Sequence, residues 1–419
     1  MTGVALLGLY VALFAGAMAL VRLSARRRRP GTGARKTVTF GDESAVRPDR
    51  VASVLSLVVV FLLWGAFTGS RWTPLHVPGP FLGEASFAYT AAAPDGSTDE
   101  ARVRFRVHEA GAEVDAPEAG GGEGFARDDG VAIRAYRSEL VRATANDEAE
   151  GLVVTAVDGQ PIAPGETVAV EGAEVTLTPR GSLSIAPDPG LQMEAIWLPP
   201  PEAVVAAFVE IARDGYQNFT LLEHLGASLL RVLAGFALGA AVGIPLGYAM
   251  GLSGWFRGWF DPIVEFMRPV PPLALIPLVI IWFGIWETGK VVLLFLAALW
   301  IMAIAARAGV SGVAIAKVHA AYSLGASRAQ VLRHVIVPNS LPEIFTGARV
   351  AMGVCWGTVV AAELVAAQKG AGMMIIAASK FQLTQIVLMG IVLIGVVGYA
   401  IDILMRRAEA WLVPWRGRA

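Results

Sequence analysis

The 419-residue chain has one cysteine and little charge. Cys355 lies within an apolar stretch, so we expect no disulfide framework in the chain and no pair of thiols to hold a metal. Only 16% of the residues are charged and 55% are hydrophobic, which is far more apolar than an ordinary soluble domain. The composition therefore predicts an integral membrane protein.

Motifs for nucleotide binding and catalysis are also missing. The run Gly284-x-x-x-x-Gly289-Lys290 imitates the beginning of a P-loop, but Val291 stands where Ser or Thr is required. The sequence has no HExxH motif and no nucleophile elbow, and its five histidines have no ligand spacing. We therefore expect no catalytic residue, no metal, no cofactor and no nucleic-acid partner for this chain.

Charge is unevenly distributed along the chain. Residues 84–195 contain 21 Asp and Glu but only 8 Arg, a net charge of −13, while the whole chain carries −1. The remainder therefore has an excess of 12 positive charges. This asymmetry indicates an acidic domain inserted into a basic membrane protein.

The N-terminal region contains two expected membrane spans. Residues 4–21 are uncharged and mostly apolar, just long enough to cross about 30 Å of hydrocarbon as a helix. Arginines follow at 26–29, and because Lys and Arg favour cytoplasmic loops, we expect the N-terminus outside. A cleaved signal peptide is the alternative. We assign 1–50 to an extra N-terminal helix and cytoplasmic loop, and 51–72 to the first core helix.

Residues 73–195 contain no further run long enough to cross a bilayer. Residues 101–107 alternate between apolar and polar with period two, which predicts a strand. Further strands are expected within 151–157, 167–170, 174–178 and 182–185, separated by turn signals such as Asp158-Gly159. The pattern favours a small all-β extracytoplasmic domain, either a sandwich or a barrel.

Residues 196–419 are expected to contain five more spans, at 228–250, 263–285, 290–307, 345–367 and 384–404. At the second of these, Pro271-Pro272 is expected to end a short helix along the inner interface, ahead of the true span. Basic residues near the span ends fall on one side, which places the C-terminus in the cytoplasm. The predicted fold is an α-helical polytopic membrane protein with a six-span core, an extra N-terminal span and an inserted β domain.

Segment 309–343 is polar and basic, although it lies between two apolar segments. Lys317, Arg328 and Arg333 place it on the inner face. Its pattern predicts two short helices, the second running from Ser327 to Val335 and stopping at Pro338 and Pro342. Such a polar knob in water is suited to docking another protein.

The spacing within this segment resembles the EAA loop of ABC importer permeases. It reads Ala320-Ala321, three residues, Gly325, nine residues, then Val335-x-Val337-Pro338, with His319 where the family has Glu. The wider stretch LGASRAQVLRHVIVPNSLPEIFTGARVAMGVCW, which contains Ala326, Ser327 and Arg328, resembles the taurine, nitrate, sulfonate and bicarbonate branch. The similarity covers roughly half of the chain, from about residue 198 to 415.

The resemblance implies a type I permease core that transports a small anionic or zwitterionic solute, taurine first and nitrate or bicarbonate as alternatives. It implies that separate ATPase subunits bind ATP and magnesium and grip segment 309–343. A solute-binding protein outside, a second copy of the chain and membrane lipid are the other implied partners. The implied location is the bacterial inner membrane.

Glycines recur every four residues at 235, 239, 243 and 247, in the span 228–250. This spacing on Gly235, Gly239, Gly243 and Gly247 makes one helix face smooth, so that another backbone can come close. A moving interface beside a pore and static packing are equally compatible with the pattern.

Four further residues are candidates for a translocation path or gate. Glu265 and Arg268 are three apart, so they share a helix face and can pair, either closing the inner mouth or anchoring the interface. Trp282 belongs to the belt or lines the path. Glu363 is an isolated acid in an apolar span, where ionisable groups usually face the bundle interior. We expect it to pair with a donor or a basic residue such as Lys369; direct solute contact is the alternative.

Two other classes of function remain open. A secondary transporter or channel would need no ATPase, but the sequence has no internal repeat of the kind such proteins often show. A membrane anchor for the acidic domain would leave the basic segment 309–343 unexplained.

Overall fold

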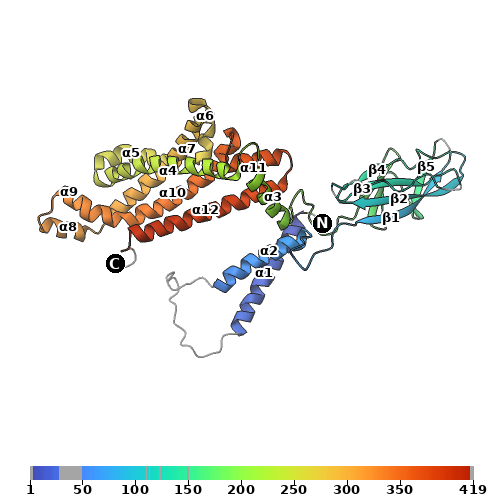
Figure 1. The fold of residues 1–419 in the computed structure, drawn as a ribbon, viewed down its shortest axis with the longest axis horizontal. Helices are drawn as coiled ribbons and strands as arrows, with labels where there is room; N and C mark the ends of the chain where they lie inside the picture. The colour runs from blue at the N-terminus through green and yellow to red at the C-terminus, as the bar shows by residue number, and fades with distance from the viewer. Residues whose placement is uncertain are drawn as a thin grey trace. The chain divides into compact units, whose positions relative to one another are not determined.

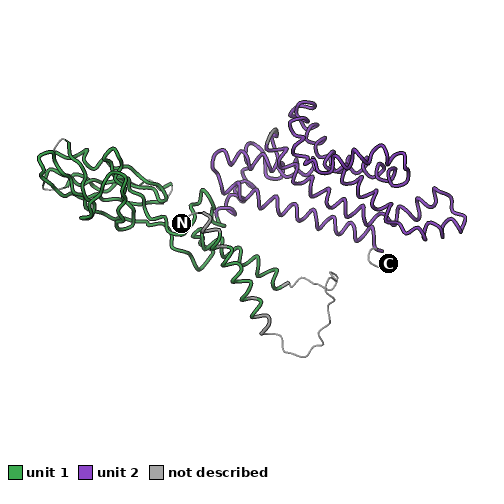
Figure 2. The backbone as a smooth tube through the Cα atoms, turned by 180° about the vertical axis from the view of Figure 1, so that it is seen from behind, with its two compact units in different colours: residues 1–202 green, residues 203–419 purple. Residues whose placement is uncertain are grey.

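The computed structural model describes residues 3–27, 50–109, 111–112, 114–121, 124–148 and 151–415. The chain divides into two compact units, residues 1–202 and residues 203–419 (Figure 2).

The first unit begins with two helices, α1 (Gly3–Arg27) and α2 (Arg50–Phe67). Two sheets follow (Figure 1). One has the strand order β3-β2-β1-β5-β6 and the other β4-β9-β8-β7. The strands are β1 (Gly83–Ala92), β2 (Thr98–His108), β3 (Asp129–Arg134), β4 (Glu139–Val141), β5 (Val153–Val157), β6 (Gln160–Pro161), β7 (Thr167–Val170), β8 (Ala173–Leu177) and β9 (Leu183–Pro187).

The alternating pattern of these strands builds the core of the domain. In β2, Val103, Phe105 and Val107 are buried while the arginines between them face outward. Buried residues of both sheets join in one cluster, which includes Tyr89 of β1 and Leu183 of β9. The strands expected near 101–107, 151–157, 167–170, 174–178 and 182–185 are present as β2, β5, β7, β8 and β9.

Both ends of the β domain return to the same place. Leu191 donates its backbone N–H to Pro78 O, and Met193 donates to Phe67 O at the end of α2. Ser70 donates its hydroxyl to Glu202, the second residue of α3 (Pro201–Asp214), over 2.6 Å. The β domain is therefore an insertion between α2 and α3 whose two connecting segments are hydrogen-bonded to each other.

The second unit is a helical bundle. Its long helices are α4 (Leu221–Leu252), α7 (Glu287–Ser311), α10 (Val337–Ala366) and α12 (Thr384–Leu412). Shorter elements are α5 (Gly254–Met267), the 3₁₀ turn η2 (Pro272–Leu275), α6 (Ile276–Phe283), α8 (Ile315–Ser323), α9 (Arg328–Val331), the π turn η3 (Leu332–Ile336) and α11 (Ala371–Lys380). Thr220 caps the beginning of α4 through a capping box with Glu223.

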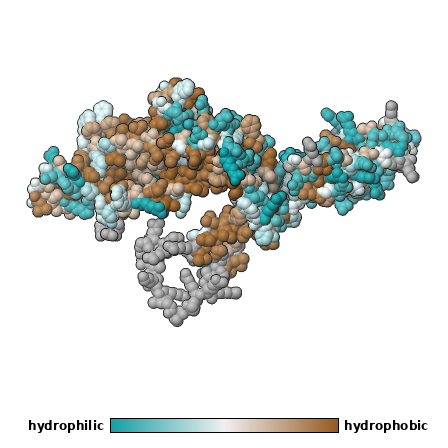
Figure 3. Space-filling view, viewed as in Figure 1, coloured by the Kyte–Doolittle hydropathy of each residue, from teal (hydrophilic) through white to brown (hydrophobic). Residues whose placement is uncertain are grey.

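Among the described residues, four helices are long and apolar enough to cross a membrane, and a fifth span results if α5 and the η2–α6 pair are counted as one. Residues 11–20 and 51–67 form shorter apolar helical stretches, so the two N-terminal spans stay predictions. Figure 3 shows apolar surface along the long helices and more hydrophilic surface around α8 and α9.

The span expected over 263–285 is broken, and the short helix expected ahead of it is present as α5, which ends at Met267. The chain bends by 94° between α5 and the η2–α6 pair. Pro269, Pro271 and Pro272 remove three of the four backbone donors of residues 269–272, so a continuous helix cannot form through this region. The helix α6 is left only eight residues long and ends at Gly284, whose φ is +71°.

Candidate functional site

The glycine face of α4 lies against α7. Gly235, Gly239, Gly243 and Gly247 are all buried in α4. A Cβ on Gly239 would lie 2.5 Å from the Cβ of Ala298, and one on Gly243 would lie 2.6 Å from Leu299 O. These contacts bring the two helix backbones together over three turns, in the manner expected where helices pack without a hydrophobic driving force.

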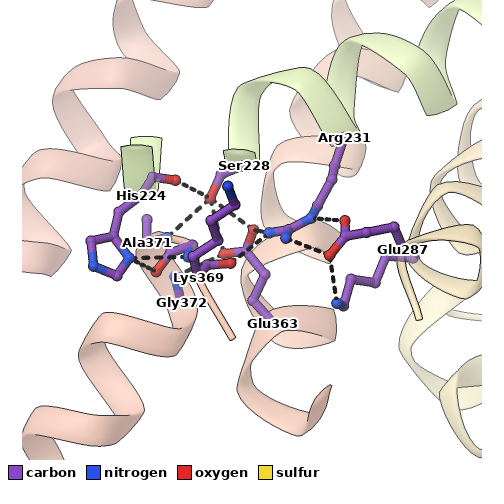
Figure 4. Close-up of polar contacts among 10 residues, drawn as sticks. His224, Ser228, Arg231, Glu287, Glu363, Lys369, Ala371 and Gly372 are labelled. Carbon is purple, nitrogen blue, oxygen red and sulfur yellow. Dashed lines mark hydrogen bonds and ion pairs between the residues drawn. The ribbon is translucent and has the colours of Figure 1, made fainter. Parts of the chain in front are cut away.

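A buried charge network lies at the beginning of α4, one turn before the glycine face (Figure 4). Arg231 is 5% exposed. Its Nε and Nη2 donate to the two carboxylate oxygens of Glu287 on α7 over 2.5 and 2.7 Å. Its Nη1 donates to Glu363 Oε1 on α10 over 2.6 Å and to Lys369 O over 2.8 Å. One guanidinium therefore joins α4, α7, α10 and the turn before α11.

Glu363 also closes the turn between α10 and α11. Its carboxylate accepts from the Ser228 hydroxyl over 2.7 Å and from the backbone N–H of Gly372 over 3.0 Å. Gly372 lies in the first turn of α11, where unsatisfied N–H groups favour a negative charge. Gly370, with φ +146°, passes so close to this carboxylate that a side chain would not fit.

His224 joins the same turn to the chain before α4. The backbone N–H of Gly370 donates to its Nδ1 over 3.1 Å, so this nitrogen is an acceptor. Nδ1 also lies 3.2 Å from Gly370 O, and Nε2 lies 3.0 Å from Tyr216 O. The imidazole is fully buried, and both of its nitrogens have polar partners.

We define the charged end as His224, Ser228, Arg231, Glu287, Lys290 and Glu363. Lys290 donates to Glu287 over 3.0 Å, so two cations face two carboxylates and the charges balance. Of these pairs, the pair of Arg231 and Glu363 is buried on both sides, whereas Glu287 is 62% exposed. A buried pair adds little net stability over an apolar core, but removing one member leaves a buried charge without its partner. The arrangement therefore favours a fixed junction of helices.

Glu363 pairs with a donor and a basic residue, as expected, but these are Ser228 and Arg231. Its side chain is 1% exposed and both carboxylate oxygens accept bonds from the chain, which favours anchoring over solute contact. Lys369 is not its partner, because Lys369 Nζ lies 5.5 Å from the ring centre of Phe219. Sequence analysis missed Arg231, although the reasoning that singled out Glu363, an ionisable group inside an apolar span, applies to it equally.

At the opposite end of the bundle, segment 309–343 projects past α7 and α10 as α8 and α9 (Figure 1). Gly325 turns the chain with φ +80°. Ser327 then caps α9 through a reciprocal capping box with Gln330. His319, Ala320, Gly325, Ser327 and Arg328 are exposed, while Ala321, Ala326, Val335 and Pro338 are partly buried. Leu324, at the tip, is 89% exposed.

The predicted stop at Pro338 and Pro342 is wrong. The helix that begins at Arg328 continues through the π turn η3 into α10, and residues 328–364 count as one helical stretch. Val337 N–H donates to Leu332 O, five residues earlier, which inserts one extra residue just before Pro338. A proline at the first turn after such a π turn needs no donor of its own, so the helix tolerates it.

The predicted pair of Glu265 and Arg268 exists but is secondary. Arg268 Nη1 lies 3.7 Å from Glu265, and both side chains are exposed. Arg307 of α7 donates to Glu265 over 2.8 Å and also pairs with Asp261, which joins α5 to α7. Trp282 is 63% exposed on α6 and meets none of the other predicted path residues.

The described residues contain no group of His, Cys, Asp and Glu side chains that could hold a metal ion. Four long apolar helices, with buried charges at one end and the exposed basic segment 309–343 at the other, define the class of protein as a helical membrane protein.

Comparison with known proteins identifies the family. Residues 243–413 match the model for the binding-protein-dependent transport system inner membrane component. The taurine transport system permease protein TauC of Escherichia coli (strain K12) is 48% identical over 223 residues, which are 53% of this chain and 81% of TauC. The chain belongs to this family of inner-membrane transport components.

Two further matches agree in extent. The putative aliphatic sulfonates transport permease protein SsuC of the same organism is 39% identical over 52% of this chain and 81% of SsuC. A solved structure of the MetNI methionine ABC transporter in inward-facing conformations matches with a TM-score of 0.42 and 18% identity, over 46% of this chain and 95% of that chain.

Proposed function

We propose that this chain is the transmembrane permease subunit of an ATP-driven ABC importer for a small sulfonate, with taurine as the first candidate. The support is its 48% identity to a taurine permease and its 39% identity to a sulfonate permease, over most of their lengths. Nitrate and bicarbonate, expected from the family resemblance, are the competing solutes.

Segment 309–343 is the observation that carries the coupling to ATP. It contains Lys317, Arg328 and Arg333, and the almost fully exposed Leu324 lies in the turn between α8 and α9. An apolar residue with basic neighbours in this position is suited to a groove on another protein. ATPase subunits that bind ATP and magnesium are the proposed occupants, and this chain contributes the path and the lever without a catalytic site.

The proposed cycle uses the helical continuity beyond this segment. Because α9, η3 and α10 form one stretch from Arg328, a push on the tip passes directly into a membrane helix. Closure of two ATPase subunits would then rock the bundles of two copies of the chain and open the path first outward and then inward. A solute-binding protein would deliver the solute from outside.

We further propose that residues 73–195 lie outside the cytoplasm, with the N-terminus outside and the C-terminus inside, in the inner membrane. The domain either helps to dock the solute-binding protein or recruits another envelope partner. Its net charge of −13 makes it a poor trap for anions.

Deletion of residues 80–193 separates these two roles. The chain enters and leaves the β domain near Pro78 and Leu191, which are hydrogen-bonded to each other. A short linker can therefore replace the deleted residues without stretching the chain between α2 and α3. Unchanged uptake with unchanged affinity for the binding protein would exclude the docking role. A raised KM for the loaded binding protein would support it.

The test of the main proposal is transport by the complete complex in proteoliposomes. The chain, its ATPase subunits and its solute-binding protein are reconstituted, and uptake of labelled taurine is followed with ATP and with a non-hydrolysable analogue. We expect uptake only with ATP, and competition by alkanesulfonates. Uptake that persists without ATP or ATPase subunits would establish a secondary transporter or channel instead.

A further inference from the structure

The side chain of Asn339 is hydrogen-bonded to both the π turn η3 and the helix α8. Its Nδ2 donates to Val335 O, inside η3, over 2.6 Å. Its Oδ1 accepts from Lys317 Nζ, on α8, over 2.8 Å. With one end of the amide donating and the other accepting, its orientation is determined by both partners together.

The next residue ties the same point to the core of the bundle. Ser340 is fully buried, and its hydroxyl lies 2.5 Å from the Tyr248 hydroxyl of α4 while also donating to Val337 O over 2.9 Å. Gly309 of α7 lies directly against Ser340, where a Cβ would come within 2.8 Å of its Cβ. Residues 339 and 340 therefore connect α8 on one side with α4, α7 and α10 on the other.

The local helix geometry makes this connection able to move. A π turn contains one residue more than an α-helical turn and is frequently found at functional sites. Pro338 and Pro342 remove two backbone donors from the first turns of α10, which weakens the helix ladder there. Side-chain hydrogen bonds such as those of Asn339 therefore contribute more to the stability of the helix at this point than they would in a regular helix.

We propose that Asn339 is a positioning residue that transmits displacement of α8 to α10 through Lys317 and the π turn. It contacts neither ATP nor solute, and it determines how much import each hydrolysed ATP yields. The inference rests on the proposed function, because it assumes that an ATPase displaces α8.

The experiment compares three variants in the reconstituted complex. Lys317→Met removes only the bond from α8, Asn339→Leu removes both bonds at similar volume, and Asn339→Asp keeps an acceptor for Lys317 but loses the donor to Val335. Lys380→Met, on α11, is the matched control for loss of a lysine charge. The readout is solute imported per ATP hydrolysed, together with complex assembly by gel filtration.

We expect Lys317→Met and Asn339→Leu to lower import per ATP by at least about threefold while ATP hydrolysis and assembly persist, and Lys380→Met to match the wild type. Asn339→Asp is expected to fall between Asn339→Leu and the wild type. An unchanged ratio in Lys317→Met overturns the inference even if Asn339→Leu fails to assemble. Failure of the wild-type complex to import with ATP would count against the proposed function, whereas wild-type import with an unchanged variant ratio counts against this inference alone.

Discussion

The two ends of the helical bundle formed by residues 203–419 are held together in different ways. At the charged end, Arg231 and Glu363 are almost completely buried and bond to four elements. At the other end, segment 309–343 exposes most of its side chains and is tied to the bundle through Lys317, Asn339 and Ser340. The difference indicates that the charged end is a fixed junction of helices, and that segment 309–343 is a handle, meaning a surface through which another protein can move the bundle.

The largest expected effect is at the fixed junction. Arg231→Met leaves the Glu363 carboxylate buried without its cation, which should destabilise the folded chain by about 3–5 kcal/mol. The measurement is thermal unfolding of the purified protein in detergent. Arg268→Met, which removes an exposed arginine, should change stability by less than about 0.5 kcal/mol.

A second substitution shows whether charge is the cause. In Arg231→Met with Glu363→Gln, an amide oxygen at the position of Oε2 can still accept from Ser228 and Gly372, and the side chain carries no charge. We expect this double variant to recover part of the lost stability. If it is no more stable than Arg231→Met, the loss comes from packing and the account of the junction is wrong.

Packing between the two ends gives the next largest effect. Gly243→Ala places a Cβ 2.6 Å from the backbone oxygen of Leu299, and the overlap should cost about 1–3 kcal/mol of the free energy of unfolding. Gly226→Ala, in the same helix, meets nothing within 4 Å and should be neutral or stabilise by up to about 1 kcal/mol. Equal effects of the two variants in thermal unfolding would contradict close packing of α4 on α7.

In segment 309–343, a substitution should weaken binding of the ATPase subunits without changing the stability of the folded chain. Leu324→Asp changes a side chain that is 89% exposed, so the unfolding temperature should stay the same. Binding of the ATPase subunits should weaken by at least about tenfold, because the apolar tip is lost from the interface. Pull-down of the ATPase at several concentrations measures this, and full binding by the variant would place the interface elsewhere.

The smallest expected effect is on the stability of the β domain, which should depend on pH. Burial, and then the neighbouring Asp147, raise the pKa of Asp129 to about 7. Because the folded-state pKa lies above the unfolded value, the folded domain binds more protons, and its stability falls as pH rises from about 4 to 7. Asp129→Asn should remove this loss and stabilise the domain by about 1 kcal/mol at pH 8.

Hydrogen exchange of β3 in the full chain, corrected for intrinsic rates, measures this effect. Protection of β3 should be greater at pH 5.5 than at pH 8 in the wild type and nearly equal in Asp129→Asn. Greater protection of the wild type at pH 8 would have the opposite sign and contradict the assignment.

Much of this architecture follows from residue patterns, and the exceptions have physical reasons. Glycines at a spacing of four predicted a close helix contact, and alternation predicted β2, because both depend on local periodicity alone. Arg231 was missed because one charge barely changes the hydropathy of a 32-residue helix. Its partners on α7 and α10 are set by tertiary contacts that no local pattern contains.

The prolines misled the prediction in one place and supported it in another. The helix expected to end at Pro271 and Pro272 does end just before them, at Met267, and the chain bends there. Pro338 was expected to do the same, but the π turn before it allows the helix to continue. A local rule for proline cannot separate the two cases, since it does not include the π turn that precedes Pro338.

The most direct test of a cytoplasmic handle uses a single thiol at its tip. With Cys355→Ala to remove the native thiol, Ser327→Cys is placed in the chain and the complete complex is treated with a short cross-linker in membranes. The account predicts a cross-link to an ATPase subunit whose yield changes when ATP binds, and no reaction with an impermeant thiol reagent added outside. Labelling from outside, with no cross-link to the ATPase, would contradict it.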